Sequence, residues 1–398
     1  MRRRVIYFIL MNQTFKGAFF LLQFFLVLAL LIAASNWEKD SSLILSETLA
    51  KDDVQFVKAE SESERPRVVF LVIQTRKSPG WCRMMLSSLL SEVSVVSIGF
   101  GKRYNHAKRP LWILDYIDGE GLRDEDVVVA FDGGDTFITG SSQVKQAVDR
   151  FLEATAPTAA VFNVTAVHRG EATAPLLFSS EGLCFAPLMK ILISSGPRKH
   201  ARKCVWYYSK VWEAMNASAD QGMVPFTSAK GLFLNAGGMV GRVWAIREAL
   251  KAYKKVLGLT DQWWCDQSIW SLLYVWSLTR TANVSLDFRI PYGILNLDYH
   301  HNFFQCPYKG LVAHPAVIHL PGGQRDWAPL MPELMNHTTW FSKLKSSLQM
   351  TRDGLTQLSN LFVKIFTCDG ETRFRRFGAL CSPRKVIDPD WLLSPLRK

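Results

Sequence analysis

The apolar positions of the chain begin with one long run and then recur in shorter segments. Residues 17–34, GAFFLLQFFLVLALLIAA, contain one strongly polar side chain, Gln23. Basic residues precede this run and mostly acidic residues follow it, which is typical of a membrane anchor with a cytosolic N-terminus. We predict an uncleaved signal-anchor at 17–34 behind a cytosolic basic tail at 1–16. A cleaved signal peptide is the alternative, because the Ala-Ala-Ser at 33–35 suits signal peptidase.

The pattern changes again after the apolar run. Residues 35–65 are polar and charged, and they predict a solvated stem. Short strand patterns then alternate with helical ones, with strands expected at 68–75, 93–100 and 127–131 and helices at 81–90, 109–118 and 246–258. Apolar residues on both faces of the strands predict a parallel sheet with helices on its faces. Further strands are expected at 159–167 and 315–320, and the apolar spacing over 341–365 predicts a helix.

These patterns divide the chain into an α/β domain at 66–330 and a helical, basic C-terminal extension at 331–398. The composition is globular, with 48% hydrophobic and 21% charged residues among 398. The net charge is +12, but residues 1–16 carry +4 and residues 341–398 carry +6, so the body is nearly neutral. A nucleic-acid-binding domain would carry its basic charge on the folded face, so we expect no nucleic-acid partner.

All seven cysteines lie after the apolar run, and so do four glycosylation sequons, at Asn163, Asn216, Asn283 and Asn336. Both features favour a body in the lumen of the secretory pathway. We expect the ER or Golgi membrane, with the cell surface or secretion as alternatives. Disulfides are expected there, but the spacing does not determine their pairing; Cys184 with Cys204 is only a guess.

The clearest chemical motif is Asp132-Gly-Gly-Asp135, directly after a buried strand. Ligands bind beyond the carboxyl ends of strands in open α/β sheets, and two carboxylates there suit Mg²⁺ or Mn²⁺ bridging to a diphosphate. A polar turn without a ligand is the alternative.

Two later segments are further candidates. His319 leaves an apolar strand and meets Pro-Gly-Gly, so it is either a metal ligand or a capped core histidine. Asn235 precedes Gly237 and Gly238, whose lack of a side chain implies positive φ or close backbone contact. Asn235 could hold a substrate hydroxyl, or this segment is a structural turn. The chain has no P-loop, no G-x-S-x-G, no HExxH and no H-x-D or H-x-E pair.

Eight segments resemble, in order, the glycosyltransferase domain of the procollagen lysyl hydroxylases, the PLOD-type domain. They are LVIQTRK, SIGFG, AFDGGDTFITGS, SSEGLCF, FLNAGGMVG, CDQSIW, LNLDYHHNFFQ and AVIHLPGG, between about Val68 and Trp327. The layout of anchor, stem and one domain also resembles the expression-site-associated glycosyltransferase-like proteins of trypanosomes. The resemblance implies a GT-A-like, Rossmann-type mixed sheet that uses a UDP-sugar and Mn²⁺.

The resemblance also implies roles for individual residues. Asp132, Asp135 and His319 would be the metal ligands, and Thr75 and Lys108 would lie near the nucleotide. Glu181, Asn235, Asp266 and Gln267 would line the sugar and acceptor pocket, with Gly237 and Gly238 beside them. Either Asp266 or Glu181 could act as general base.

The chain departs from the family in the acceptor region. Trp263-Trp264-Cys265 stands where the family has acidic residues, Phe185 stands in place of a Trp, and a basic RKHARK lies at 198–203. We therefore expect a type II membrane glycosyltransferase that acts on a glycan or protein acceptor. A catalytically inactive relative that binds a ligand or partner is the first alternative, and a membrane-surface adaptor using its basic C-terminus is the second.

Overall fold

The computed structural model describes residues 65–219, 232–279, 285–307, 314–322, 330–341 and 352–382. From Pro66 onward the chain forms one compact unit. The strands are β1 (Val68–Ile73), β2 (Val95–Ile98), β3 (Val127–Asp132), β4 (Thr136–Ile138), β5 (Leu176–Glu181), β6 (Phe233–Arg242), β7 (Leu295–Leu297), β8 (Phe304–Gln305), β9 (Val317–His319), β10 (Phe362–Phe366) and β11 (Thr372–Arg376).

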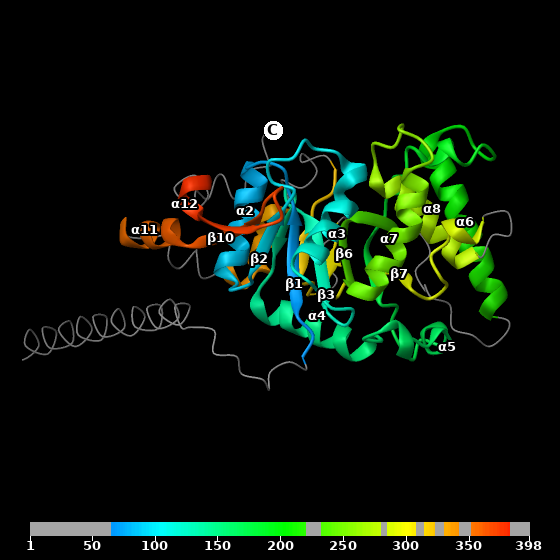
Figure 1. Ribbon diagram of the computed structural model, residues 1–398, viewed down its shortest axis with the longest axis horizontal. Helices are drawn as coiled ribbons and strands as arrows, with labels where there is room; N and C mark the ends of the chain where they lie inside the picture. The colour runs from blue at the N-terminus through cyan, green and yellow to red at the C-terminus, as the bar shows by residue number, and fades with distance from the viewer. Residues whose placement is uncertain are drawn as a thin grey trace, which may run out of the picture. The chain divides into compact units, whose positions relative to one another are not determined.

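Helices connect and cover these strands (Figure 1). They are α2 (Pro79–Leu90), α3 (Arg109–Gly119), α4 (Ser141–Ala154), α5 (Val164–His168), α6 (His200–Ala219), α7 (Val243–Leu257), α8 (Asp266–Thr279), α9 (Met331–Asn336), α11 (Arg352–Asn360) and α12 (Phe377–Leu380). Short 3₁₀ helices are η2 (His106–Lys108), η3 (Ala159–Val161), η4 (Met189–Ile191) and η5 (Leu286–Phe288).

The main sheet has eight strands in the order β11-β10-β2-β1-β3-β6-β5-β7. Strands β10, β2, β1 and β3 run parallel to one another, and β6 is antiparallel to both of its neighbours, β3 and β5. A second sheet of three strands has the order β4-β9-β8. The protein is therefore a mixed α/β structure with flanking helices. The alternation of strand and helix patterns predicted a parallel sheet, which is confirmed for β2, β1 and β3 and wrong for β6, whose antiparallel pairing makes the sheet mixed.

Two apolar clusters, one on each face of the main sheet, explain the continuous apolar runs in its strands. In β1, Leu71 and Ile73 pack into the cluster that holds α3, α7 and α8. Phe70 and Val72 pack into the other cluster, with α2, α4 and the small sheet. A strand that is buried on both faces needs apolar residues at every position, so period-two alternation is absent from β1 and β3.

The expected strand at 159–167 is wrong. This segment forms η3 and α5, and Val161 and Val164 are exposed. The Asn163 side chain accepts hydrogen bonds from the backbone N–H groups of Thr165 at 3.0 Å and Ala166 at 3.1 Å. The N-cap asparagine therefore starts a helix in a segment whose β-branched residues favoured a strand.

The expectation of a purely helical C-terminal extension is also wrong. Helix α11 ends at Asn360, and Phe362 and Ile365, which were expected in the helix, lie in β10. Strand β10 pairs parallel to β2, with Ile365 opposite Ser97, so this segment extends the main sheet. The helical spacing of Leu355, Leu358 and Phe362 continues past the end of α11 into a strand, in which Phe362 is exposed while Val363, Ile365 and Phe366 are buried.

The predicted signal-anchor at 17–34 and the stem lie outside the described residues. Within the part of the chain that is described, no helix is long and apolar enough to cross a membrane.

Two disulfides join described segments, Cys82 with Cys381 and Cys184 with Cys204. The second confirms the one pairing that was guessed. The first connects α2 to the residue after α12, across 299 positions of the sequence. It therefore fastens the C-terminal strands to the body covalently.

We expect the double variant Cys82→Ala/Cys381→Ala to lose about 2–5 kcal/mol of unfolding free energy, because the unfolded chain gains freedom when so long a loop is opened. Urea unfolding under non-reducing conditions measures the loss. Cys368→Ala is the matched control, because Cys368 is unpaired and exposed. Equal unfolding midpoints for the double variant and the parent would contradict this role.

Candidate functional site

Strand pairing brings the predicted metal ligands together at the carboxyl end of β3. Asp132 ends β3, a Gly-Gly turn follows, and Asp135 precedes β4. The hydroxyl group of Thr136 donates to the carbonyl oxygen of Asp132 and closes this turn. Strand β4 pairs antiparallel with β9, in which His319 lies opposite Thr136. The small sheet therefore carries His319 to the Asp132–Asp135 turn.

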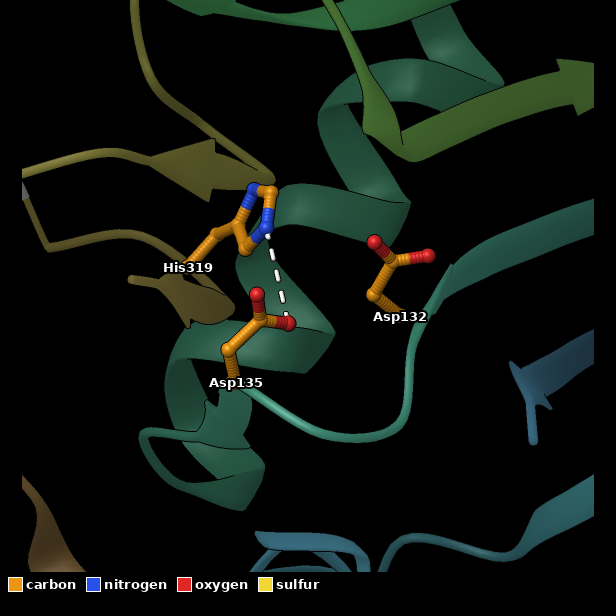
Figure 2. Close-up of side chains that lie close together, drawn as sticks. All are labelled: Asp132, Asp135 and His319. Atoms are coloured by element: carbon orange, nitrogen blue, oxygen red, sulfur yellow. Dashed lines mark ion pairs between the residues drawn. The ribbon is translucent and has the colours of Figure 1, made fainter. Parts of the chain in front are cut away.

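One ligand atom from each of Asp132, Asp135 and His319 lies within 4.8 Å of the others. Figure 2 shows the carboxylates of the two aspartates and the imidazole facing a common space. The His319 Nε2 atom is 3.7 Å from Asp135 Oδ1, and His319 is buried while the aspartates are partly exposed. Two carboxylates and one imidazole form a donor set that can hold a divalent metal ion.

The His319 ring is held from its other side. The Cys306 thiol lies 3.9 Å from His319 Nδ1 and also 3.8 Å from the Ser179 hydroxyl. Nε2 is therefore the nitrogen that faces the carboxylates. Burial lowers the pKa of His319, but the neighbouring Asp135 and Cys306 outweigh burial and hold it well above its ordinary value.

Gly237 and Gly238 lie within β6, a ten-residue strand, so the alternative of a structural turn is wrong. Neither has a positive φ. A Cβ atom on Gly237 would collide with the His319 ring, and one on Gly238 would collide with the Phe304 ring. Close packing is therefore the reason for both glycines, and Gly237 leaves the space in which the His319 ring sits.

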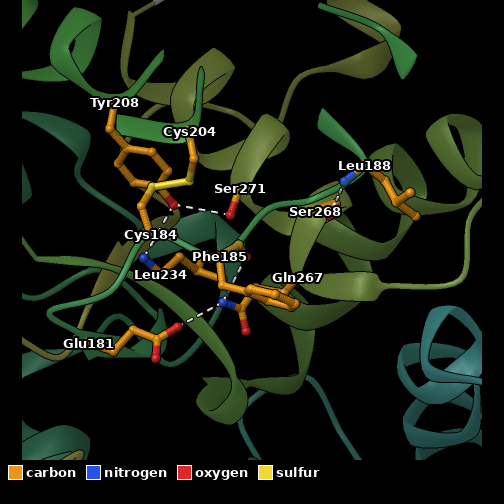
Figure 3. The surroundings of a disulfide bond; sticks show 10 residues. All are labelled: Glu181, Cys184, Phe185, Leu188, Cys204, Tyr208, Leu234, Gln267, Ser268 and Ser271. Carbon is orange, nitrogen blue, oxygen red and sulfur yellow. Dashed lines mark hydrogen bonds between the residues drawn. A yellow bond between two sulfur atoms is a disulfide. The ribbon is translucent and has the colours of Figure 1, made fainter. Parts of the chain in front are cut away.

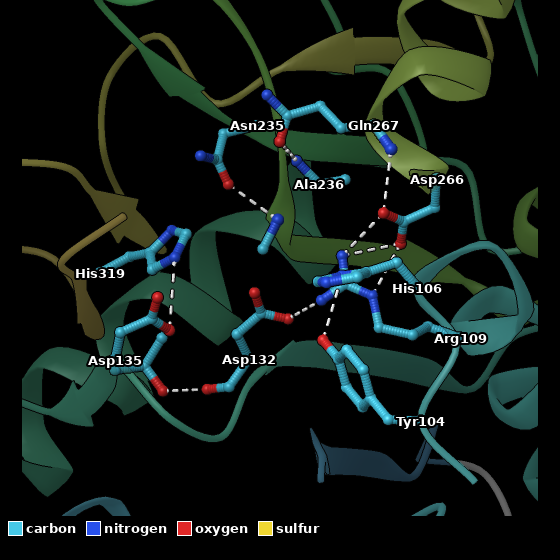
Figure 4. Close-up of polar contacts among 12 residues, drawn as sticks. Tyr104, His106, Arg109, Asp132, Asp135, Asn235, Ala236, Asp266, Gln267 and His319 are labelled. Carbon is cyan, nitrogen blue, oxygen red and sulfur yellow. Dashed lines mark hydrogen bonds and ion pairs between the residues drawn. The ribbon is translucent and has the colours of Figure 1, made fainter. Parts of the chain in front are cut away.

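Arg109, at the first position of α3, links the metal ligands to a third carboxylate. Its guanidinium group pairs with Asp132 Oδ1, and its Nε and Nη2 atoms each donate at 2.8 Å to Asp266, the first residue of α8. Figure 4 shows Arg109 between the two aspartates. Arg109 and Asp266 are both buried. Such an ion pair is favourable only with this degree of hydrogen bonding.

Burial and these charges shift the titration of the site. Burial raises the pKa of Asp266 to about 6, although Arg109 opposes the shift. The pKa of Asp132 is also raised, mainly by burial, with Arg109 acting against it and Asp135 adding to it. Burial, together with the nearby Arg109, lowers the pKa of His106 to about 4. His106 is therefore neutral at pH 7, with its Nδ1 atom 3.0 Å from the Tyr104 hydroxyl.

A second polar network holds the other predicted pocket residues. The Gln267 side chain donates at 2.8 Å to Glu181 and at 3.0 Å to the Phe185 carbonyl, and it accepts at 3.2 Å from the backbone of Ala236. Figure 3 shows the Glu181–Gln267 bond beside the Cys184–Cys204 disulfide. Asn235 accepts at 2.7 Å from the Gly237 N–H. Gln267 is thus a cross-link between β5, β6 and α8.

Two cavities meet at the metal-ligand group. One of about 710 Å³ is lined by the predicted pocket residues Glu181, Asn235, Asp266 and Gln267. The other, of about 900 Å³, is lined by Thr75, Arg76, Lys102, Arg103, Tyr104 and the first residues of α2. His106, Asp132, Asp135 and Gly322 line both. An ion at this position would contact the contents of both cavities.

The structure does not bring every predicted residue to the site. Lys108 is exposed and lines neither cavity, while Gly238 is packed beneath Phe304. Arg109, Tyr104, His106 and Cys306 were not anticipated. A signal for Arg109 was available, because a cation in the first turn of a helix opposes the helix dipole and requires nearby anions. The other three had no distinguishing sequence pattern.

The comparisons with protein families and with curated proteins do not point to a function. No protein-family model matches the chain, and a search of curated proteins finds no match. The metal-ligand group and the two cavities beside it are therefore the observations on which a function can be based.

We expect Arg109→Met to lower the unfolding free energy by about 3–5 kcal/mol at pH 7.5, because the buried Asp266 and the partly exposed Asp132 would lose their cation. The loss should shrink at pH 5. Without Arg109 the folded-state pKa of Asp266 rises above about 6, further from its unfolded value of about 3.9, so protonation at pH 5 stabilises the folded state. Urea unfolding at both pH values measures the change.

Arg375→Met is the matched control, because Arg375 is exposed on β11 and forms no ion pair in the described residues. A loss in Arg109→Met that is equal at pH 5 and pH 7.5 would show that the carboxylates are not the source of the destabilisation.

Proposed function

We propose that this protein is a metal-dependent glycosyltransferase with a GT-A-like domain, which transfers a sugar from a UDP-sugar to a hydroxyl acceptor. The observation that carries this proposal is the position of Asp132, Asp135 and His319 at the junction of two cavities. A donor nucleotide in one cavity and an acceptor in the other would meet at this point. The mixed oxygen and nitrogen donor set suits Mn²⁺, with Mg²⁺ as the alternative.

The cavity of about 900 Å³ has the chemistry of a nucleoside diphosphate site. Arg76, Lys102 and Arg103 bring positive charge to its wall, and Ser78, Pro79 and Gly80 place the N-terminus of α2 there. Cations and helix N-termini both favour phosphate groups. The Tyr104 ring, which is partly exposed in the same cavity, offers a surface on which a base can stack.

In the net transfer, the acceptor oxygen forms a bond to the anomeric carbon of the sugar, and the bond from that carbon to the UDP oxygen breaks. The electron pair leaves with UDP, and the acceptor proton passes to a carboxylate of the protein. A bound Mn²⁺ would supply Lewis acidity at the diphosphate. Asp132, Asp135 and His319 would hold that ion, while the basic wall of the cavity would hold the nucleotide.

Two carboxylates in the acceptor cavity are candidates for the proton acceptor, Glu181 and Asp266. Both oxygens of Asp266 accept hydrogen bonds from Arg109, and Oδ1 also accepts from the Gln267 N–H at 2.9 Å. We therefore assign Asp266 as the positioning residue for Arg109. Glu181, which Gln267 orients, is the better candidate for the general base.

The proposed setting is the ER or Golgi lumen, with the predicted signal-anchor holding the protein at the membrane. Two disulfides among the described residues support an oxidising compartment. Of the four sequons, Asn163 and Asn336 are on exposed positions, where a glycan can be attached.

A non-catalytic binding protein is the second candidate, and one observation favours it. Trp263 and Trp264 stand where the resemblance calls for acidic residues; Trp263 is buried, and Trp264 lines the acceptor cavity. Hydrolysis of a panel of UDP-sugars by the purified protein with Mn²⁺ distinguishes the two. Release of UDP supports the enzyme, whereas UDP binding without release from any sugar supports the binding protein.

We expect Asp135→Ala to weaken Mn²⁺-dependent UDP binding by at least about 100-fold, since loss of a partner that merely orients a ligand already costs 10- to 100-fold. Titration calorimetry with Mn²⁺, and again with a chelator, measures the effect. Asp149→Ala is the matched control, because Asp149 is an exposed aspartate on α4 that pairs with Lys145. Equal UDP affinity of Asp135→Ala and the parent, with and without Mn²⁺, would overturn the metal-bridged mechanism.

A further inference from the structure

Four large, exposed apolar side chains line the acceptor cavity. They are Leu183, Phe185, Val205 and Trp264, and each exposes between 43% and 58% of its surface. We call these four residues the apolar rim. Isolated exposed apolar side chains are ordinary, but four that line one cavity mark a binding surface.

The apolar rim is covalently braced. Leu183 and Phe185 flank Cys184, Val205 follows Cys204, and these two cysteines form a disulfide (Figure 3). Trp264 is fixed at the other side, where buried Cys265 and Asp266 follow it at the start of α8. The exposed side chains are therefore carried on segments that cannot easily collapse together. A surface that is rigid before binding loses less entropy when a ligand arrives.

The cavity is lined by both polar and apolar side chains. Glu181, Asp266 and the metal-ligand group are among the polar ones. The lining residues on the segments that carry the apolar rim, at 182–185, 200–205 and 264, include one polar side chain, His200. A glycan or a peptide lying there would lose water from its hydroxyl or amide groups without gaining partners, which is unfavourable. A hydrocarbon group would meet no such penalty.

We propose that the acceptor is an amphiphilic alcohol, with its reacting hydroxyl toward Glu181 and its hydrocarbon body against the apolar rim. This inference rests on the proposed function, since it names the acceptor class of the same site. It also gives a role to Trp264, which departs from the acidic pattern of the resembling family. An exposed indole packs favourably against an apolar body, whereas a carboxylate covered by hydrocarbon would lose its hydration.

The test uses methyl, butyl and hexyl β-glucosides as probes, with the full-length protein held in amphipol and with Mn²⁺ and UDP present. We expect affinity to rise about three-fold for each added methylene, as hydrocarbon is buried against the rim. Trp264→Ala should weaken hexyl glucoside about ten-fold and leave methyl glucoside nearly unchanged. Trp264→Phe should retain most of the dependence on chain length.

Phe374→Ala is the matched control, because Phe374 is an aromatic residue of β11 with 58% exposure that lines neither cavity. It should bind all three probes as the parent does, which also accounts for binding to the amphipol. Equal affinity for the three glucosides, or the same chain-length dependence in Trp264→Ala, would overturn the inference.

Titration of UDP in the same samples separates the two proposals. In one outcome, UDP binds in an Mn²⁺-dependent manner while the affinity for the glucosides does not depend on chain length. That result overturns the amphiphilic acceptor and leaves the glycosyltransferase proposal standing. Failure of UDP to bind overturns the acceptor role, whatever the chain-length dependence.

Discussion

The guanidinium group of Arg109 lies between two carboxylates, and the site depends on this contact. It joins the start of α3 to the end of β3 through Asp132 and to the start of α8 through Asp266. Burying one of these charged groups without its partners would be very unfavourable. The ion pairs therefore hold the start of α3, the end of β3 and the start of α8 together. The same contact places Asp132 where the two cavities meet and Asp266 in the wall of the acceptor cavity.

The second constraint is the packing of His319 against the main sheet. The β4–β9 pairing brings the histidine to Asp135, and Gly237 in β6 leaves the space for its ring. Cys306, which follows β8, then fixes the orientation of the imidazole. The metal-ligand group is therefore assembled by both sheets, which meet at this point, and its geometry does not depend on a single loop.

The differences between the expected and observed elements have a common cause. At 159–167 a single side-chain cap at Asn163 outweighs the strand preference of the valines, and at 362–366 pairing with β2 outweighs a helical spacing. In β6 the glycines allow close packing by His319 and Phe304, which the sequence left open against a turn. Each of these outcomes is set by a neighbour that is distant in the sequence or by a side-chain cap, and residue periodicity carries no record of either.

The sequence by itself determined the mixed α/β class, the buried strands β1 and β3, and the Asp132–Asp135 pair, because continuous apolar runs and a carboxylate pair after a strand are local patterns. It also singled out His319 at the end of an apolar strand, while Glu181, Asp266 and Gln267 were implied only by the resemblance to a known family. Only the tertiary structure decided that Arg109 joins Asp132 to Asp266, that Gln267 is a cross-link, and that the apolar rim lines the same cavity as Glu181. These are relations between side chains from separate elements, and they exist only once strand pairing and helix packing have fixed the distances between them.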